Sequence, residues 1–198
     1  MQRLVIASNN PGKLREFQYL LQPLGIEVLT QAQLGIVEAE EPHITFVENA
    51  LSKARHVSRL SGLPALADDS GICVTALGGA PGVLSARYAG DDPKSDHRNN
   101  LKLLQAMQGM ADRRAHYYCV LVVLRHADDP QPLIADGEWH GEIAHEECGD
   151  GGFGYDPLFW LPELGKTSAQ LEREEKHAIS HRGKALKVML DKLKMMAG

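Results

Sequence analysis

The sequence predicts an α/β fold, in which short apolar strands alternate with amphipathic helices. Apolar runs at residues 4–7 and 63–67 have the length and composition of buried strands, and polar turn residues follow each run. Between such runs, apolar residues recur at helical spacing. The chain contains no internal repeat and no low-complexity linker, so we expect residues 1–198 to form a single domain.

The beginning of the chain predicts a β-α-β unit. The strand at residues 4–7 leads to Asn10, a favourable helix cap, and to Pro11, which is preferred at the first helical position. The helix continues to Gly25, and residues 27–30 begin the next strand. The apolar positions of this helix are Leu14, Phe17, Leu20, Leu21 and Leu24.

Two acidic residues follow the next strand. Thr45 begins a capping-box sequence and predicts a helix that ends near Gly62. The strand at residues 63–67 comes next and runs into Asp68 and Asp69. We therefore expect both carboxylates at the carboxyl end of this strand, where open α/β sheets place their ligands.

The second half of the chain shows the same alternation. It predicts a helix over residues 96–107, a long strand over residues 117–124, and a pair of strands at residues 133–135 and 142–144. A last helix starts near Ser180. Its buried positions at helical spacing are Leu186, Met189, Leu190 and Leu193.

Composition and charge limit the possible functions. The 198-residue chain is 43% hydrophobic and 24% charged, as expected for a globular protein with a substantial core. A formal net charge of −5 argues against a protein that binds duplex nucleic acid. Cys73, Cys119 and Cys148 have no C-x-x-C spacing, and no apolar stretch is long enough for a signal peptide or a membrane span. We expect a soluble, cytoplasmic protein.

A phosphate site is predicted at the start of the first helix. The polar turn at residues 8–13 leaves backbone N–H groups exposed at the helix N-terminus, where the helix dipole favours an anion. Lys13 lies in the first turn, where a cation is unfavourable by roughly 0.3–1 kcal/mol unless an anion is bound. The alternative is a solvated lysine after a common capping sequence.

A magnesium site is predicted at Asp68 and Asp69. Adjacent carboxylates at a strand end can bind Mg²⁺ while one of them polarises a water molecule. A further carboxylate could come from Glu38, Glu40 or Glu41. Mg²⁺ takes one or two protein carboxylates and fills its other positions with phosphate oxygens, which suits an acidic pair beside a phosphate-binding turn. The alternative is an ordinary Asp-Asp-Ser-Gly turn.

Two segments of the second half suit a flat ligand. Residues 151–157 combine glycines, two aromatic rings and a carboxylate, so backbone and ring faces could approach a planar ring. His181 and Arg182 oppose the dipole at the start of the last helix, and Lys176 lies shortly before them. The planar fork of Arg182 can donate to a keto oxygen and disfavours an amino group, so it could discriminate purines at position six. The alternative for these cations is a basic solvent-exposed face.

Three other patterns do not fit their usual sites. The glycines at 149, 151 and 154 match the dinucleotide fingerprint, but residues 155–157 interrupt the helix that it requires. Residues 165–167 resemble the end of a P-loop, but Trp160 stands in place of its first glycine. His177 and His181 have zinc-ligand spacing without a third ligand.

Five motifs together resemble the inosine/xanthosine triphosphate pyrophosphatase family, whose bacterial members are called dITP/XTP pyrophosphatases. They are Ser-x-Asn-x-x-Lys-x-x-Glu at residues 8–16, Ala-Asp-Asp-Ser-Gly at 67–71, Gly-Ala-Pro-Gly with Ser-Ala-Arg-Tyr at 79–88, Gly-Phe-Gly-Tyr-Asp-Pro at 152–157 and Ser-His-Arg-Gly at 180–183. The motifs follow the family's order and cover nearly the whole chain.

The resemblance implies an elongated mixed sheet flanked by helices, with two lobes, a substrate cleft between them, and a homodimer. It implies Mg²⁺-dependent hydrolysis of dITP, ITP or XTP to the monophosphate and pyrophosphate, which removes deaminated purines from the nucleotide pool. Asp69 would be the proton acceptor and, with Glu40, a metal ligand, although the adjacent Glu41 leaves the choice of glutamate open. The implied substrate contacts are Ser8, Asn9, Asn10, Pro11, Gly12, Lys13, Ser70, Phe153, Gly154, Tyr155, Asp156, Lys176, His181 and Arg182.

The expected reaction is in-line attack of an activated water on the α-phosphorus. Asp69 takes the water proton, while Mg²⁺ and Lys13 neutralise charge on the departing pyrophosphate. Two alternatives are a related pyrophosphatase acting on pyrimidine or methylated nucleotides, and a regulator that binds nucleotides without cleaving them.

Overall fold

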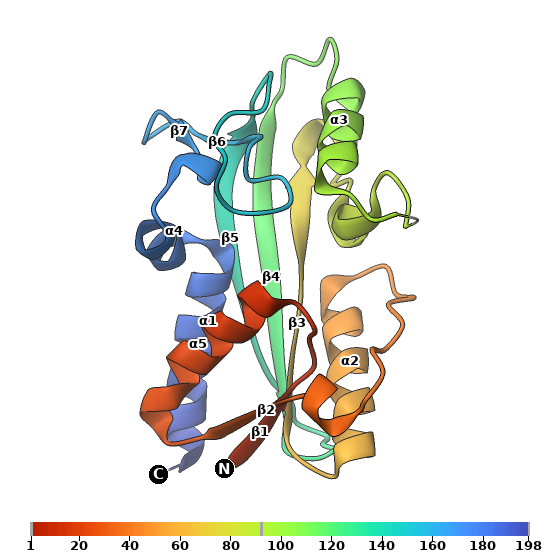
Figure 1. The fold of residues 1–198 in the computed structure, drawn as a ribbon, viewed down its shortest axis with the longest axis vertical. Helices are drawn as coiled ribbons and strands as arrows, with labels where there is room; N and C mark the ends of the chain where they lie inside the picture. The colour runs from red at the N-terminus through yellow and green to blue at the C-terminus, as the bar shows by residue number, and fades with distance from the viewer. Residues whose placement is uncertain (1, 92, 198) are drawn as a thin grey trace. The chain divides into compact units, whose positions relative to one another are not determined.

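The computed structural model describes residues 2–91 and 93–197, and it confirms an α/β fold with helices flanking a mixed sheet (Figure 1). Within these residues, the strands pair in the order β2-β1-β3-β4-β5-β6-β7. The strands are β1 (Arg3–Ile6), β2 (Glu27–Thr30), β3 (Ala65–Val74), β4 (Arg114–Leu124), β5 (Leu133–Ile143), β6 (Phe159–Leu161) and β7 (Lys166–Thr167). The α-helices are α1 (Pro11–Leu21), α2 (Phe46–Ser61), α3 (Asp96–Ala106), α4 (Arg173–Ile179) and α5 (His181–Ala197). The 3-10 helices are η1 (Gln22–Leu24), η2 (Ala32–Leu34), η3 (Thr75–Leu77), η4 (Gly82–Arg87) and η5 (Ser168–Gln170).

The chain divides into two compact units. Unit 1 consists of Met1–Asp69, Cys119–Asp136 and Ala185–Gly198, and unit 2 consists of Ser70–Tyr118 and Gly137–Lys184. Because β3, β4, β5 and α5 run through both units, neither unit is one continuous segment. The single domain over residues 1–198 and the substrate cleft between lobes stay predictions.

Unit 1 contains the β-α-β opening and covers its strands with helices on both faces (Figure 1). β1 runs parallel to β2 on one side and to β3 on the other. α1 and α5 pack on one face, where Phe17 and Met189 are buried against Ile6 and Leu121. α2 covers the other face with small side chains such as Ala54. Burial on both faces explains why these strands read as continuous apolar runs.

Unit 2 has a separate core that is rich in aromatic rings. The ring of Tyr117 meets Phe159 edge-on at a centroid distance of 4.7 Å, and Trp139 meets Phe159 at 5.1 Å. Leu103 and Met107, at the end of α3, are buried in the same cluster. Among the described residues, no helix combines the length and the apolar composition that a membrane span requires.

Most of the predicted elements are confirmed, but several differ, and β6 and β7 were not predicted. The predicted strand pair at residues 133–135 and 142–144 is wrong, because β5 is one continuous strand of 11 residues. α4 was not predicted, and Ser180 separates it from α5 with an extended backbone (φ −69°, ψ 160°). His177 and His181 therefore do not share a helix. The side chains of Leu20 and Leu24 lie outside the described part of the structure.

The prediction that Asp68 and Asp69 lie at the end of their strand is also wrong. β3 continues to Val74, so both residues occupy its interior. The pairing of β1 with β3 stops at Ile6 beside Leu66, and β3 runs on past the end of its parallel neighbour. Asp and Gly are poor strand formers, so local propensity does not indicate this extension, and burial within the sheet overrides it. The carboxylates therefore lie just beyond the carboxyl end of β1.

The connection between β4 and β5 depends on a buried carboxylate. Asp129 is 1% exposed and accepts hydrogen bonds from the Arg125 side chain (Nε, 2.8 Å) and from the backbone N–H groups of Arg125 and Gln131 (both 3.0 Å). The hydrogen bonds from the Arg125 guanidinium hold the pKa of Asp129 well below its usual range. Ionised Asp129 therefore stabilises this turn.

We expect Asp129→Asn to lower the free energy of unfolding by about 1–3 kcal/mol at neutral pH, because bonds to a buried charged group are lost. The folded-state pKa is depressed, so the stabilisation is complete above the unfolded pKa of about 3.9 and is lost as pH falls toward the folded value. Urea unfolding from pH 7 to pH 3 should show the difference between wild type and variant shrinking in acid. A difference that stays constant to pH 3 would contradict this assignment.

Candidate active site

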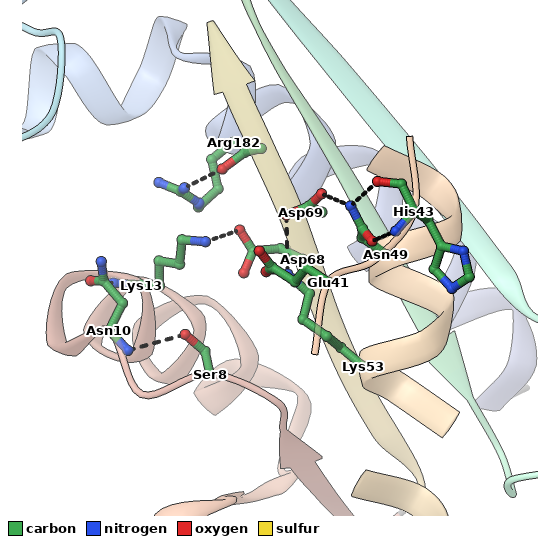
Figure 2. A network of polar contacts seen from close by, with 11 residues as sticks. Ser8, Asn10, Lys13, Glu41, His43, Asn49, Lys53, Asp68, Asp69 and Arg182 are labelled. Carbon is green, nitrogen blue, oxygen red and sulfur yellow. Dashed lines mark hydrogen bonds and ion pairs between the residues drawn. The ribbon is translucent and has the colours of Figure 1, made fainter. Parts of the chain in front are cut away.

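The turn after β1 is a helix cap, as the sequence predicted. Asn10 Oδ1 accepts hydrogen bonds from the N–H groups of Gly12 (2.9 Å) and Lys13 (3.2 Å). Ser8 Oγ accepts the N–H of Asn10 at 3.2 Å, and this bond closes the turn (Figure 2). Pro11 begins α1, whose 11 residues direct their positive dipole end at the same turn. The turn therefore presents the polar environment that favours an anion.

Lys13 is not a freely solvated lysine, so that alternative is wrong. Its Nζ lies 2.9 Å from Asp68 Oδ2, and only 18% of its side chain is exposed (Figure 2). Asp68 itself is 2% exposed and belongs to β3. The first turn of α1 is thus linked by charge to the acidic pair of β3.

Asp69 lies at the centre of a polar network in unit 1 (Figure 2). Lys53 Nζ, from α2, lies 3.1 Å from Asp69 Oδ1 and 2.7 Å from Glu41 Oε1. Asn49, one helical turn before Lys53, donates from Nδ2 to Asp69 Oδ2 at 3.3 Å. Both carboxylate oxygens of Asp69 are therefore held by side chains of α2.

Burial and neighbouring charges adjust the protonation of this network. Burial raises the pKa of Asp69 above its ordinary value, and the charge of Glu41 adds to this effect while Lys53 opposes it. Burial alone would lower the pKa of Lys53, but Asp69, Asp68 and Glu41 together hold it above its ordinary value. Lys53 therefore stays charged, and the Asp69 carboxylate is a stronger base than an exposed aspartate.

The donor set suits a hard divalent cation. Three carboxylates, Glu41, Asp68 and Asp69, gather around the two lysines Lys13 and Lys53. Carboxylate oxygens are the ligands that Mg²⁺ prefers. Across residues 2–91 and 93–197, no three His, Cys, Asp or Glu side chains are arranged to hold a metal by themselves. A metal here would therefore complete its coordination with oxygens of a bound ligand, as Mg²⁺ does with phosphates.

Of the three glutamates considered from the sequence, the structure brings Glu41 into the network. Glu41 is half-buried against Lys53, whereas Glu38 and Glu40 are exposed. Glu40 and Glu41 are adjacent in the chain, so a difference of one position decides which carboxylate joins the site.

The segment at residues 152–156 forms a tight loop in unit 2, organised by Asp156. The Asp156 carboxylate is 2% exposed and accepts the backbone N–H of Phe153 and the hydroxyl of Ser168, both at 2.8 Å. It also forms an ion pair with Lys176. The Lys176 Nζ lies 4.9 Å from the centre of the Phe153 ring, within range of a cation–π contact. Lys176 is thus part of the loop and not of a solvated basic face.

The two aromatic residues of this loop have different surroundings. Phe153 is 46% exposed and can offer a ring face to a planar ligand. Tyr155 is 3% exposed and packs in the unit 2 core, where its hydroxyl donates to the carbonyl of Ser85 at 2.7 Å. Gly154 donates its N–H to Asp96 at 2.6 Å. The Tyr155 side chain therefore anchors the loop.

His181 and Arg182, at the start of α5, are buried, so the alternative of a basic solvent face is wrong for them as well. Arg182 Nη2 donates to the hydroxyl of Ser70 at 3.2 Å (Figure 2). The His181 ring stacks on Tyr117 at 4.7 Å, with 9° between the planes. Burial holds the pKa of Tyr117 well above its ordinary value, so its hydroxyl stays protonated. An aromatic wall therefore fixes the orientation of His181.

Sequence reasoning missed Asn49 and Lys53. Both are buried on the face of α2 that also carries Ala50, Ala54 and Val57. The available signal was their i, i+4 spacing within this apolar stripe, because buried polar side chains need partners. The partner, Asp69, could not be recognised without the packing of α2 on β3.

The loop at residues 152–156 depends on glycine at position 152. Its φ is +76°, and a Cβ built there would overlap the Asp156 carboxylate. Gly165 has a similar φ of +62° but open space around its Cβ, so it is a matched control for backbone strain alone.

We expect Gly165→Ala to lower the free energy of unfolding by about 1–2 kcal/mol through left-handed strain. Gly152→Ala should cost a further ~1–3 kcal/mol, because the methyl group must displace Asp156. Urea unfolding of both variants measures the difference. Equal losses would show that the Asp156 contact does not constrain position 152.

The geometry agrees with comparisons to known proteins. The Ham1 family model matches residues 4–192. The chain is 64% identical over 197 residues to a dITP/XTP pyrophosphatase of Ralstonia nicotianae, with 98% of each chain covered. It is 68% identical over 186 residues to a dITP/XTP pyrophosphatase of Nitrosomonas europaea, covering 94% of this chain and 91% of the relative. The solved structure of a HAM1 protein from Coxiella burnetii superposes with a TM-score of 0.94 at 46% identity, covering 98% of this chain and all of the other.

Proposed function

This chain belongs to the Ham1 family, and on that premise we propose that it hydrolyses the deaminated purine nucleoside triphosphates dITP, ITP and XTP to the monophosphate and pyrophosphate. The relatives that match nearly its full length are dITP/XTP pyrophosphatases, so the enzyme is a hydrolase of the nucleotide pool. The observation that carries the proposal is the buried Asp69 network beside the capped N-terminus of α1. The match over residues 4–192 supports a single functional domain.

Unit 1 supplies the groups that handle the triphosphate. The Lys13 ammonium binds phosphate oxygens at the positive dipole end of α1, and Ser8 and Asn10 hold the turn in shape. Asp69 accepts the proton of the attacking water, because its raised pKa makes it the better base. Lys53 keeps Asp69 ionised in the free enzyme. No covalent intermediate is required.

Unit 2 supplies the groups that recognise a keto purine. Arg182 can only donate hydrogen bonds, so it favours a keto oxygen over an amino group at position six of the base. The exposed ring of Phe153 offers a stacking face, with Lys176 beside it as a further donor. Pyrimidine bases also carry keto oxygens, so it is the similarity to dITP/XTP pyrophosphatases that argues against the alternative of a pyrimidine-directed enzyme.

We propose Mg²⁺ as the cofactor, with Asp69 and Glu41 as the protein ligands. The carboxylate donors of the network support this choice. When bound, Mg²⁺ would supply charge neutralisation on the departing pyrophosphate. The family resemblance also supports a homodimer in the cytoplasm.

Pyrophosphate release tests the proposed function directly. We expect rapid release from dITP and XTP with Mg²⁺, little release from dATP, whose amino group at position six opposes Arg182, and none with a chelator. For dGTP, dTTP and UTP, whose bases carry keto oxygens, we expect little release because the relatives are dITP/XTP pyrophosphatases. Asp69→Asn should lower kcat by roughly 10²–10⁴-fold, because the general base is lost, and should leave nucleotide binding largely intact. Intact dITP after incubation with Mg²⁺ would favour the binding regulator, and equal rates on dTTP would favour the pyrimidine enzyme.

A matched pair of variants tests the choice of glutamate. Glu41→Gln should raise the Mg²⁺ concentration for half-maximal activity by about 10-fold or more, because one of few charged ligands is lost. Glu40→Gln should leave it unchanged, because that side chain is exposed. Titration of dITP hydrolysis with Mg²⁺ measures both, and the reverse result would assign the metal to Glu40.

A further inference from the structure

The network around Asp69 closes into a ring of contacts through Asn49 (Figure 2). Lys53 links Asp69 Oδ1 to Glu41, and Asn49 binds Asp69 Oδ2. Two residues after Glu41, the backbone of His43 binds back to Asn49. The carboxylate of Asp69 and the loop that carries Glu41 are therefore joined by two separate links, one charged and one neutral.

Asn49 holds this loop with a two-point clamp. The N–H of His43 donates to Asn49 Oδ1 at 3.0 Å, and Asn49 Nδ2 donates to the carbonyl of His43 at 3.2 Å. With the bond to Asp69, the fully buried carboxamide uses its acceptor and both of its N–H donors. Aspartate would lack both donors, so asparagine is the side chain of this size that satisfies all three contacts.

The two links respond differently to a cation. Lys53 is a positive charge on a flexible stem, so a metal ion that approaches the carboxylates competes with it. Asn49 is neutral, and it can hold Asp69 and the loop backbone whether or not a cation is present. The neutral link through Asn49 is therefore the one that can keep the carboxylates of Glu41 and Asp69 in their relative positions during turnover.

We infer that Asn49 is a positioning residue, which holds the loop of Glu41 against Asp69 and so maintains the pair of carboxylates that takes the metal. This inference rests on the proposed function, since it concerns the metal of that same site. Asn49 itself contacts neither the substrate nor the reacting atoms in this role.

A second asparagine offers a matched control. Asn49 in α2 and Asn99 in α3 each stand four residues after the N-cap of their helix. Asn99 is also buried and clamps a preceding loop, accepting the N–H of Ala89 at 2.7 Å and donating to the carbonyl of Ala86 at 3.3 Å. Its loop belongs to unit 2, whereas the Asp69 network belongs to unit 1. Asn99→Ala therefore removes the same kind of clamp without touching the carboxylates.

The experiment compares wild type with Asn49→Ala, Asn49→Asp and Asn99→Ala in dITP hydrolysis across a range of Mg²⁺ concentrations. We expect the Asn49 variants to lose about 10–100-fold in kcat and to need about 10–100-fold more Mg²⁺, as for other residues that orient metal ligands. The KM for dITP at saturating Mg²⁺ should change little, because the turn at residues 8–13 is untouched. Binding of Mn²⁺ in the presence of the α,β-methylene analogue of dITP, followed by electron paramagnetic resonance, should weaken by a similar factor.

The control separates positioning from general stability. Asn99→Ala should lower Tm as Asn49→Ala does, yet keep the wild-type dependence on Mg²⁺ and the wild-type Mn²⁺ affinity. Asn49→Asp preserves side-chain volume, and His43→Pro removes the clamped N–H at an exposed residue while also fixing its φ, so both extend the test if Asn49→Ala does not fold.

The possible results are distinct. Wild-type metal dependence in the Asn49 variants would overturn the inference, as would parallel losses of kcat, KM and Tm in Asn49→Ala and Asn99→Ala. If wild type itself does not release pyrophosphate from dITP, the proposed function is wrong and the inference falls with it. A loss of metal affinity and kcat confined to the Asn49 and His43 variants supports it.

Discussion

The burial of an ionised carboxylate at Asp69 is the constraint on which the candidate site depends. A charge removed from water must be paired and hydrogen-bonded, or the group takes up a proton and loses its function. Lys53 and Asn49 meet this requirement from α2, and they do so at positions where the helix otherwise carries small apolar side chains. When α2 packs on β3, it therefore also brings Lys53 and Asn49 to Asp69, the proposed general base.

The same constraint explains the extended course of β3. Asp68 and Asp69 are poor strand residues, yet they lie in a strand that continues past the end of β1. Where β1 stops, the side chains of Lys13 and Lys53 approach the carboxylates from α1 and α2. Here charge pairing outweighs the low strand propensity of aspartate. Such exceptions to local propensity are expected at functional sites.

The two units differ in the kind of group that each core holds. The core of unit 1 is mainly aliphatic, and its buried charges include the network around Asp69. The core of unit 2 is aromatic, so it can orient the flat ring of His181 and anchor a glycine-rich loop through Tyr155. Asp69 and Ser70 are consecutive in β3 and belong to different units, so this one strand carries residues of both units.

The sequence by itself determined the features that arise from neighbouring residues. Asn10 caps α1 through bonds to residues two and three positions away, so the phosphate turn and the β-α-β opening could be predicted. The five motifs also identified the family. Tertiary structure alone decided that Glu41 rather than Glu40 joins the network, and that Asn49 and Lys53 support Asp69. These contacts span 12 to 20 residues, and they form only when α2 packs on the sheet. A short polar pattern cannot specify them, because the same side chains on an unpacked helix would face water.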